Sequence, residues 1–384
     1  MPSELRVDKV SSTTSPYDPV FSTTGGALSH RNMIINGAMQ VAQRGTSATV
    51  DGYGTVDRFR ANLGGNDENA TQAQHALTSS DTGPYEEGFR YSLQITNGNQ
   101  TSGAGTGDRV GILYRMEAQD IANSGWNYTS SSSYITLSFW CKSSVSQNFY
   151  VRVTSDDGTA QNYVFETGSL TANTWTKITK TIPGNSNLQF DNDTGIGLDI
   201  EVMMFRGTDT TGSVTLNAWG AYNSSVRIPD MTSTWYTTND ATWELTGVQL
   251  ERGSVATPFE HRSYADELRR CQRYFQKFYG STNYWGSGAW YSTTQANIVL
   301  DTFGPMRADP IGSSSSVSDF RIGNSNMSGV PTVTSMTITT SGTAVSGKFR
   351  LYVTTGSGGS AGNATVFLAY NGSTEGIINL DAEL

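Results

Sequence analysis

The chain has 384 residues, enough for two or three domains that each bury a core. Its 41 glycines, many aromatic residues and only 15% charged residues favour short strands joined by polar turns, so we expect an all-β protein. The net charge of −9 argues against nucleic acid or an anionic membrane as a ligand, because both bind cationic surfaces.

The chain contains two cysteines, Cys141 and Cys271. Two are too few for a disulfide framework, and their spacing fits no metal site, so we expect both to be buried free thiols. Free thiols fit a protein that is assembled in a reducing cytoplasm. No segment approaches the roughly 20 apolar residues of a membrane helix, and no apolar run follows a basic start, so we expect a soluble chain without a secretion signal.

Residues 1–30 contain one short strand-like stretch, ELRVDKV, with apolar Leu5, Val7 and Val10, followed by a Pro- and Ser/Thr-rich stretch. So few apolar residues cannot form a core. We interpret this segment as an arm that becomes ordered against a partner, with a disordered tail as the alternative.

Residues 31–262 hold about ten runs with the period-2 alternation of strands, bounded by Gly, Asn, Asp or Ser clusters. This spacing predicts a β-sandwich of the jelly-roll kind. Two rows should face inward: Ile135, Leu137 and Phe139, and Leu198, Ile200 and Val202. The runs are 57–63, 89–96, 109–116, 134–144, 149–155, 161–168, 174–182, 198–205, 213–222 and 242–251.

Glu260 and His261 follow Pro258-Phe259 at the end of the last of these runs. No hydrolase motif accompanies them, so a catalytic pair is the weaker interpretation. We expect a structural hinge between two domains, in which Val255 and Phe259 seal the end of the sandwich and Pro258 breaks the strand ladder.

A helix is predicted over residues 263–280. Ser263 and Asp266 fit a capping box, and Gly280 follows the last periodic residue. An apolar stripe with four- and three-residue spacing could form the seam of a trimer or pack on the helix's own sandwich. The stripe consists of Tyr264, Leu268, Cys271, Phe275 and Phe278.

Residues 281–384 contain further strand-like runs with Gly/Ser-rich turns, which predict a smaller sandwich. The stretch NYWGSGAWYS is the best candidate for receptor binding, because sugar rings stack on exposed aromatic faces and its glycines would give loop freedom. Its aromatic residues are Tyr284, Trp285, Trp290 and Tyr291, with Trp235-Tyr236 as a second candidate. The alternative is that some of these side chains lie in the core or a trimer interface.

Asp191 and Asp193 resemble an oxygen-ligand cluster and are a weak calcium candidate. Their spacing does not match an EF-hand, and Asx residues are common in turns for their own backbone hydrogen bonds. We therefore expect no metal and no other cofactor.

Several blocks together resemble the tail fibres and receptor-binding proteins of tailed bacteriophages, notably marine and cyanobacterial ones. They are NMIINGAMQVAQRGTS, GYGTVDRFR, TWELTGVQLERGSVATPFEHRSYADELRRCQRYFQ, FGPMRADP and IINLDAEL, and they stand in the family's order and spacing. The resemblance covers residues 31–384, and the arm is similar only in style.

This resemblance implies a non-enzymatic virion appendage that is assembled in the host cytoplasm and forms a homotrimer. It implies a carbohydrate-binding-module-like first sandwich, an arm that docks to tail or portal-adaptor proteins, and a carboxy-terminal domain that meets a host-surface polysaccharide. The alternatives are a capsid-attached fibre or decoration protein, and a glycan-degrading tailspike enzyme. Against the enzyme stand the missing β-helix repeats and the missing compact catalytic set.

Overall fold

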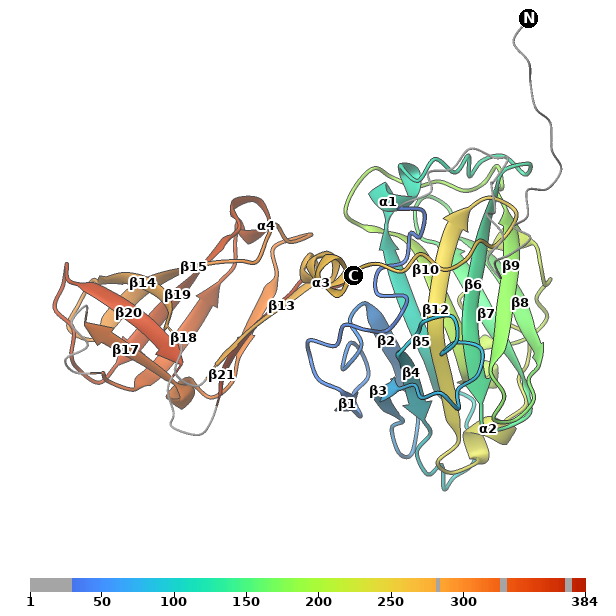
Figure 1. Cartoon of the computed structure of the whole chain (residues 1–384), viewed down its shortest axis with the longest axis horizontal. Coiled ribbons are helices and arrows are strands. Elements are labelled where there is room, and N and C mark those ends of the chain that lie inside the picture. Colours follow the sequence, from blue (N-terminus) through green and yellow to red (C-terminus); the bar gives the residue numbers. More distant parts are fainter. Residues whose placement is uncertain (1–29, 281–283, 325–329, 370–374) are drawn as a thin grey trace, which may run out of the picture.

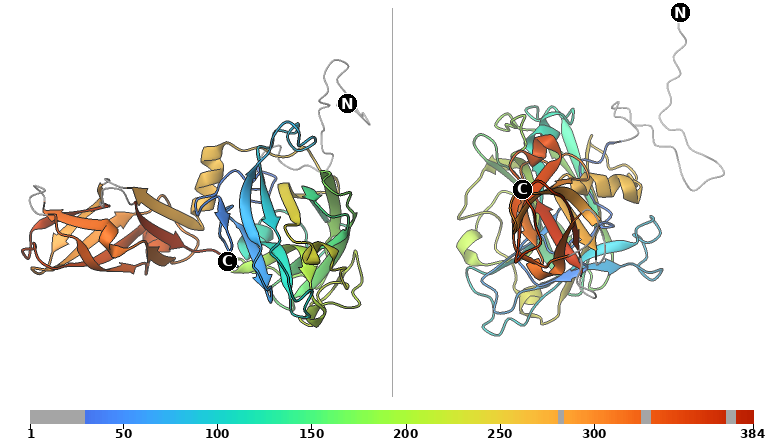
Figure 2. Two further views of the ribbon diagram at one scale, coloured as in Figure 1. Left: turned by 90° about the horizontal axis from the view of Figure 1, so that it is seen from below. Right: turned by 90° about the vertical axis from the view of Figure 1, so that its left-hand side faces the viewer.

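A computed structural model describes residues 30–280, 284–324, 330–369 and 375–384. The described chain forms two β bodies joined through a short helix, α3 (Tyr264–Gln272) (Figure 1). The smaller body extends from the larger one (Figure 2). The predicted attachment residues Leu5, Val7 and Val10 lie outside the described residues.

The larger body is a sandwich of two six-stranded antiparallel sheets. The consecutive strands β4, β5, β6 and β7 alternate between the two sheets, as in a jelly roll. The predicted fold class is confirmed. Sheet I runs in the order β1 (Ser47–Ala48), β3 (Thr71–Ala76), β4 (Tyr91–Thr96), β12 (Thr242–Arg252), β6 (Tyr134–Ser143) and β9 (Thr176–Pro183). Sheet II runs in the order β11 (Trp219–Ala221), β8 (Gln161–Ser169), β7 (Asn148–Ser155), β10 (Ile196–Arg206), β5 (Arg109–Glu117) and β2 (Phe59–Gly64).

Strand alternation fills the core between these sheets. Both predicted inward rows are buried there, the row of β6 on one sheet and the row of β10 on the other. The register places Ile200 between Tyr114 of β5 and Val153 of β7. The side chains at the intervening positions of β10 consequently point to the outer face of sheet II. Three short helical turns, α1 (Ala118–Ala122), η1 (Thr208–Thr210) and α2 (Thr234–Thr237), lie in the connections.

The smaller body pairs a three-stranded sheet with a six-stranded one around a second core. Sheet III has the order β13 (Phe275–Gly280), β21 (Gly376–Asp381) and β16 (Ile311–Ser314). Sheet IV has the order β17 (Phe320–Asn324), β20 (Ala364–Ala369), β14 (Tyr284–Trp290), β15 (Gln295–Asp301), β19 (Lys348–Thr355) and β18 (Val333–Thr339). Two turns, η2 (Val317–Asp319) and α4 (Thr343–Ser346), complete it.

The predicted helix is too long. It begins as expected, because Ser263 Oγ accepts the backbone N–H of Asp266 at 3.2 Å. It ends at Gln272, and Phe275–Gly280 forms strand β13, which pairs with β21. Phe275 and Phe278 are three residues apart, so they continue a helical stripe in the sequence but point to opposite sides of a strand.

The predicted trimer seam is therefore wrong as a single helical surface. Cys271 and Phe275 are buried within their own chain, and Phe278 packs against the core of the smaller body. Leu268 is half-buried, and Tyr264 is the only one of the five that is exposed. Both cysteines are buried free thiols, as predicted.

The two bodies meet through a buried ion pair. Arg58 of the larger body is fully buried and pairs with Glu383, which follows β21. The Arg58 guanidinium also lies 3.4 Å from the ring centroid of Tyr274. Arg44 adds a second pair, 3.0 Å from Asp381. These contacts fix residues 381–383 against the larger body.

A second contact crosses the junction at Glu117, a buried residue at the end of β5. Its carboxylate accepts hydrogen bonds from Arg273 at 2.8 and 2.7 Å and from the Tyr274 hydroxyl at 2.6 Å. Burial raises the pKa of Glu117, but the hydrogen bonds from Arg273 and Tyr274 outweigh it and hold the pKa below its usual value. The segment that leaves α3 is thereby tied to sheet II.

No helix in the described ranges is long and apolar enough to cross a bilayer.

We expect Glu383→Gln to lower the free energy of unfolding by about 3 kcal/mol, because it leaves the Arg58 guanidinium buried without a counter-charge. Urea denaturation followed by tryptophan fluorescence measures the change. Lys348→Gln is the control, since it removes one partner of the exposed Lys348–Asp301 pair and should change stability by less than about 0.5 kcal/mol. An unchanged midpoint for Glu383→Gln would mean that the ion pair does not hold the junction.

Candidate functional site: an aromatic groove on the smaller body

The four predicted receptor-binding aromatic residues fall on or beside strand β14. Tyr284 is 65% exposed and Trp285 is half-buried at one end of the strand, whereas Tyr291 is 49% exposed just past the other end. Trp290 is only 1% exposed and belongs to the core of the smaller body. Trp290 is therefore a structural residue, and the prediction that it contacts a receptor is wrong.

The second candidate pair, Trp235 and Tyr236, is also in a core. Both side chains are fully buried in the larger body. Tyr236 stacks on Phe205 with ring centroids 4.4 Å apart, and its hydroxyl lies 2.9 Å from a carboxylate oxygen of Asp108. Neither ring can meet an external ligand without unfolding the sandwich.

Tyr284 and Trp285 do lie together in a surface groove of about 560 Å³. The groove lies beside strand β13, an edge strand of sheet III, and strands β14 and β15 of sheet IV. We call it the aromatic groove. Its lining residues are Lys277, Phe278, Tyr279, Tyr284, Trp285, Asp301 and Phe303.

Three aromatic side chains of the groove are open to solvent: Tyr279, Tyr284 and Phe303 each have more than half of their surface exposed. Phe303 stacks on Phe278 with ring centroids 4.6 Å apart, and Trp285 packs edge-on against the buried Phe320 at 5.6 Å. Phe303 is thus supported by a ring that packs against the core, and Trp285 is anchored to the core in the same way. Such support keeps an aromatic face in place before a ligand arrives.

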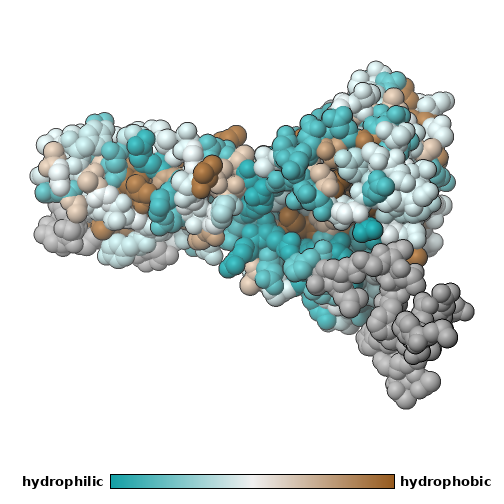
Figure 3. All heavy atoms as spheres, turned by 90° about the horizontal axis from the view of Figure 1, so that it is seen from above, coloured by the Kyte–Doolittle hydropathy of each residue, from teal (hydrophilic) through white to brown (hydrophobic). Residues whose placement is uncertain are grey.

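The groove also carries two charged groups at its margin. Lys277 lies 5.6 Å from the ring centroid of Tyr279, and Asp301 forms an exposed ion pair with Lys348. Figure 3 shows hydrophobic patches on the surface of the smaller body, set among hydrophilic residues. Flat apolar faces with polar groups at their edge suit a ligand that has both apolar faces and hydroxyl groups.

The glycines of this stretch do not form a flexible loop, contrary to the sequence-based expectation. Gly286 and Gly288 lie within strand β14. A Cβ atom on Gly288 would lie 1.8 Å from the carbonyl oxygen of Asn297 in β15. Glycine is required there because the two strands approach closely.

Tyr279, Phe303 and Lys277 are groove residues that the sequence interpretation missed. Lys277 and Tyr279 fall in the segment assigned to the helix. The sequence FQKFYG does not alternate between polar and apolar residues, so it carries no local signal for a strand.

The proposed calcium residues behave as turn residues. Asp193 Oδ1 accepts the backbone N–H of Gly195 at 2.8 Å, and the Asp191 backbone N–H donates to Asp157 at 2.9 Å. Within the described part of the chain, no group of three or more His, Cys, Asp or Glu side chains is placed to hold a metal ion.

The Glu260–His261 corner is used for structural hydrogen bonds. The Glu260 carboxylate accepts the backbone N–H groups of His30 and Asn32, the latter at 2.7 Å. His261 Nε2 lies 2.8 Å from the Glu87 carbonyl oxygen, and Phe259 packs on Phe89 with ring centroids 4.8 Å apart. Phe259 was expected to seal the end of the sandwich, and its packing on Phe89 fits this expectation. Val255 was expected to do the same, which is wrong because its side chain is exposed.

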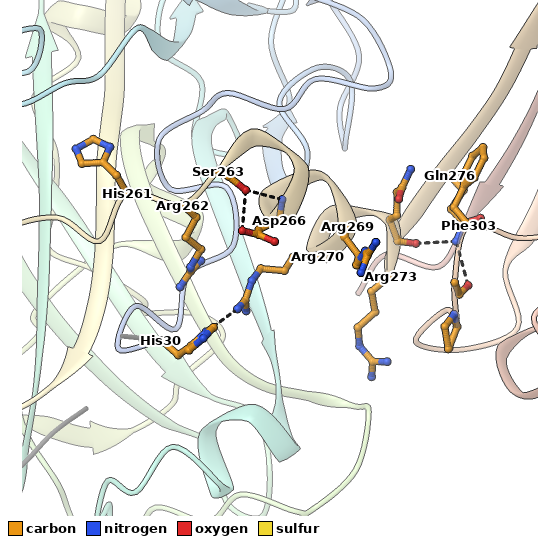
Figure 4. Close-up of a pocket in the computed structure, with 13 residues that line it drawn as sticks. His30, His261, Arg262, Ser263, Asp266, Arg269, Arg270, Arg273, Gln276 and Phe303 are labelled. Atoms are coloured by element: carbon orange, nitrogen blue, oxygen red, sulfur yellow. Dashed lines mark hydrogen bonds between the residues drawn. The ribbon is translucent and has the colours of Figure 1, made fainter. Parts of the chain in front are cut away.

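Another groove, of about 930 Å³, runs along α3 at the junction and is lined by four arginines (Figure 4). Arg262 donates to the Ile34 carbonyl oxygen at 3.0 Å, Arg273 is held by Glu117, and Arg270 donates to His30 Nδ1 at 3.0 Å. Because three of the four guanidiniums are already engaged in holding segments together, we interpret this groove as part of the junction.

No family model matches the chain, and no curated protein matches it in sequence. Solved structures give low similarity. The chain resembles the enzymatically active domain of tailspike protein 4 of bacteriophage CBA120 at 9% identity and a TM-score of 0.32, over 58% of this chain and 21% of that one, so it spans about a fifth of that structure.

Two further structures are similar to nearly their full length. One is a putative sugar binding protein from Bacteroides thetaiotaomicron, at 10% identity and a TM-score of 0.28, covering 58% of this chain and 100% of that one. The other is the N-terminal cellulose-binding domain of β-1,4-glucanase C from Cellulomonas fimi, at 13% identity and a TM-score of 0.26, covering 56% and 99%. These values are too low to assign a function.

Trp290 is buried and Tyr284 is exposed, although both belong to strand β14, and their effects on stability test this assignment. Trp290→Ala should lower the free energy of unfolding by about 3–5 kcal/mol, because it opens a cavity in the core of the smaller body. Tyr284→Ala should change it by less than about 0.5 kcal/mol, because the ring is mostly in water. Urea denaturation measures both, and equal losses would contradict the placement of Tyr284 on the surface.

Proposed function

We propose that the protein is a non-enzymatic phage appendage that binds a host-surface glycan in the aromatic groove. The observation that carries the proposal is the set of three exposed rings, Tyr279, Tyr284 and Phe303, that line one groove. Sugar rings present apolar C–H faces that pack on such rings, while their hydroxyl groups can bond to Lys277 and Asp301 at the margin. The resemblance to phage receptor-binding proteins supplies the virion context.

The groove lies on the smaller body, and the amino-terminal arm belongs to the opposite end of the chain sequence. An appendage must bind its receptor with one part of the chain and attach to the virion with another. We propose that the arm docks to tail or portal-adaptor proteins and that the chain acts as a homotrimer. Light scattering tests the trimer, since the solution mass should then be near three times 41.4 kDa.

We expect Tyr284→Ala to weaken glycan binding by the full-length chain at least about tenfold, equivalent to about 1.4 kcal/mol, because it removes one stacking face. An array of bacterial surface polysaccharides identifies the bound glycan, and calorimetry with that glycan measures the affinity. Tyr291→Ala is a matched control, since it removes an exposed tyrosine of the same domain outside the groove.

An unchanged affinity for Tyr284→Ala would overturn the assignment of this groove. A loss with Tyr291→Ala alone would move the site to the other end of β14. Incubation of the same glycan with the wild-type chain, followed by an assay for new reducing ends, separates binding from cleavage. Release of reducing ends would favour the tailspike enzyme over a binding protein.

Removal of residues 1–29 should leave both bodies folded, because the core residues of both bodies lie after residue 30. If the arm docks the protein, the truncated chain should keep its glycan affinity but be absent from purified virions. Immunoblotting of virions made with the truncated gene measures incorporation. Normal incorporation would contradict the attachment role of the arm.

A further inference from the structure

A second cleft lies on the outer face of sheet II in the larger body. Strands β2, β5, β7 and β10 turn polar side chains to this face, because their alternate residues fill the core. The segment after β10 covers part of the face, with Ile228 packed on Met203 and Val164. Between this segment and strands β2 and β5 remains a cleft of about 600 Å³.

The cleft carries an excess of positive charge although the chain has a net charge of −9. Six arginines and three aspartates line it. With Glu201 beneath it and Asp51, which pairs with Arg60 at 3.0 Å, the arginines still outnumber the carboxylates by one. We call it the arginine cleft. Its arginines are Arg60, Arg109, Arg115, Arg152, Arg206 and Arg227.

A buried carboxylate holds two of these arginines in place. Glu201 accepts hydrogen bonds from Arg152 and Arg206, each at 2.8 Å, and from Asn62 at 2.6 Å. Burial raises the pKa of Glu201, but Arg152 and Arg206 outweigh it and lower the pKa to about 2. The carboxylate is therefore ionised at all physiological pH values and is fully used in positioning the two guanidiniums.

The guanidiniums of Arg152 and Arg206 are largely out of water, since both side chains are at least nine-tenths buried. The Nε atom of each is shielded from solvent and has no hydrogen-bond partner within the described residues. A ligand in the cleft therefore meets the positive charge of these two groups rather than their Nε donors.

The segment after β10 brings one further cation, Arg227, to the same place. Arg152 and Arg227 lie 5.7 and 5.8 Å from the ring centroid of Tyr222, so both guanidiniums lie near this ring. Burial, together with the nearby Arg206 and Arg152, lowers the pKa of Arg227. Cations that repel one another in a cleft gain stability when an anion binds between them.

We propose that the arginine cleft binds an acidic saccharide through the carboxylates of its uronate units. Guanidinium groups bind carboxylates in a two-pronged geometry, which suits a uronate. Thr210 adds a neutral hydrogen-bonding group for sugar hydroxyls, and Tyr222 offers a ring. A nucleic acid fits less well, because a single ring offers little stacking for its bases.

Calorimetry of the full-length chain with tetragalacturonate tests the proposal, with a neutral galactose tetrasaccharide and an oligothymidylate as comparisons. Arg227→Gln should weaken tetragalacturonate binding about tenfold, because it removes one cation, whose Nε donates to the neutral Ser224 carbonyl oxygen. Arg60→Gln, at the other side of the cleft, should also weaken it. Arg350→Gln is the matched control, an exposed arginine of β19 in the smaller body, and should bind as the wild type does.

The same titration includes Tyr284→Ala, which should not affect tetragalacturonate binding because it alters only the aromatic groove. This variant distinguishes an error in the assignment of the aromatic groove from an error in the assignment of the arginine cleft. The proposal is overturned if the folded wild-type chain does not bind tetragalacturonate, binds the neutral tetrasaccharide equally well, or keeps its affinity in both cleft variants. Tighter binding of oligothymidylate would identify the cleft as a phosphate-polymer site instead.

The pH dependence of the same binding gives a second readout. Burial and the neighbouring Asp156 raise the pKa of Asp199 to about 7, with Glu201 adding to the rise and Arg115 and Arg152 opposing it. Asp199 is therefore mostly protonated below this pH and adds a negative charge to the cleft above it. Tetragalacturonate should bind about fivefold more weakly at about pH 8 than at about pH 6. Asp199→Asn should remove most of this difference, and a wild-type affinity that rises with pH would count against binding of an anion here.

Discussion

The buried pair of Arg58 and Glu383 is the constraint on which the relative placement of the two bodies depends. A guanidinium taken fully out of water is tolerated only with a counter-charge and good contacts, and Glu383 and the Tyr274 ring supply them. The two partners come from opposite ends of the described chain, so the pair forms only when both bodies are folded and correctly joined. A buried ion pair of this kind favours one arrangement over others more than it adds stability, and it makes the region after α3 a fixed junction rather than a loose hinge.

Strand alternation made most of the fold predictable, because both sandwiches bury one face of each long strand. The prediction of secondary structure failed where a helical spacing of apolar residues continued into a segment that forms a strand. Tyr264, Leu268 and Cys271 fit a helix, and Phe275 and Phe278 continue its spacing, yet pairing with β21 makes the last two part of a strand. The decisive partner, residues 376–381, lies about a hundred positions later in the chain. Short strands such as β1 and β16 were missed because they carry too few residues to show a period.

The candidate site was predictable only in part for the same reason. The sequence shows that aromatic residues cluster near β14, but not which of them face water. Trp290 is buried because β14 pairs with both β15 and β20, which fixes the face on which each side chain lies. The arginine cleft gave no local signal, because its six arginines come from residues 60 to 227 and converge only when β2, β5, β7 and β10 align. Sites assembled across strands require the register, and the register is a long-range property.

The combination of a negative net charge with a locally positive cleft would make the binding of acidic polysaccharides more selective. Acidic polysaccharides on a cell surface repel a body of net charge −9 at long range, which suppresses weak nonspecific adhesion. If the proposals hold, only a ligand segment that enters the cleft would reach its excess positive charge, where low solvent access strengthens each charge contact. The aromatic groove, in contrast, would recognise apolar ring faces and would depend little on charge. Two sites of different chemistry on rigidly joined bodies would let one chain require two features of a surface at once, since joining binding modules raises the effective concentration for the second contact.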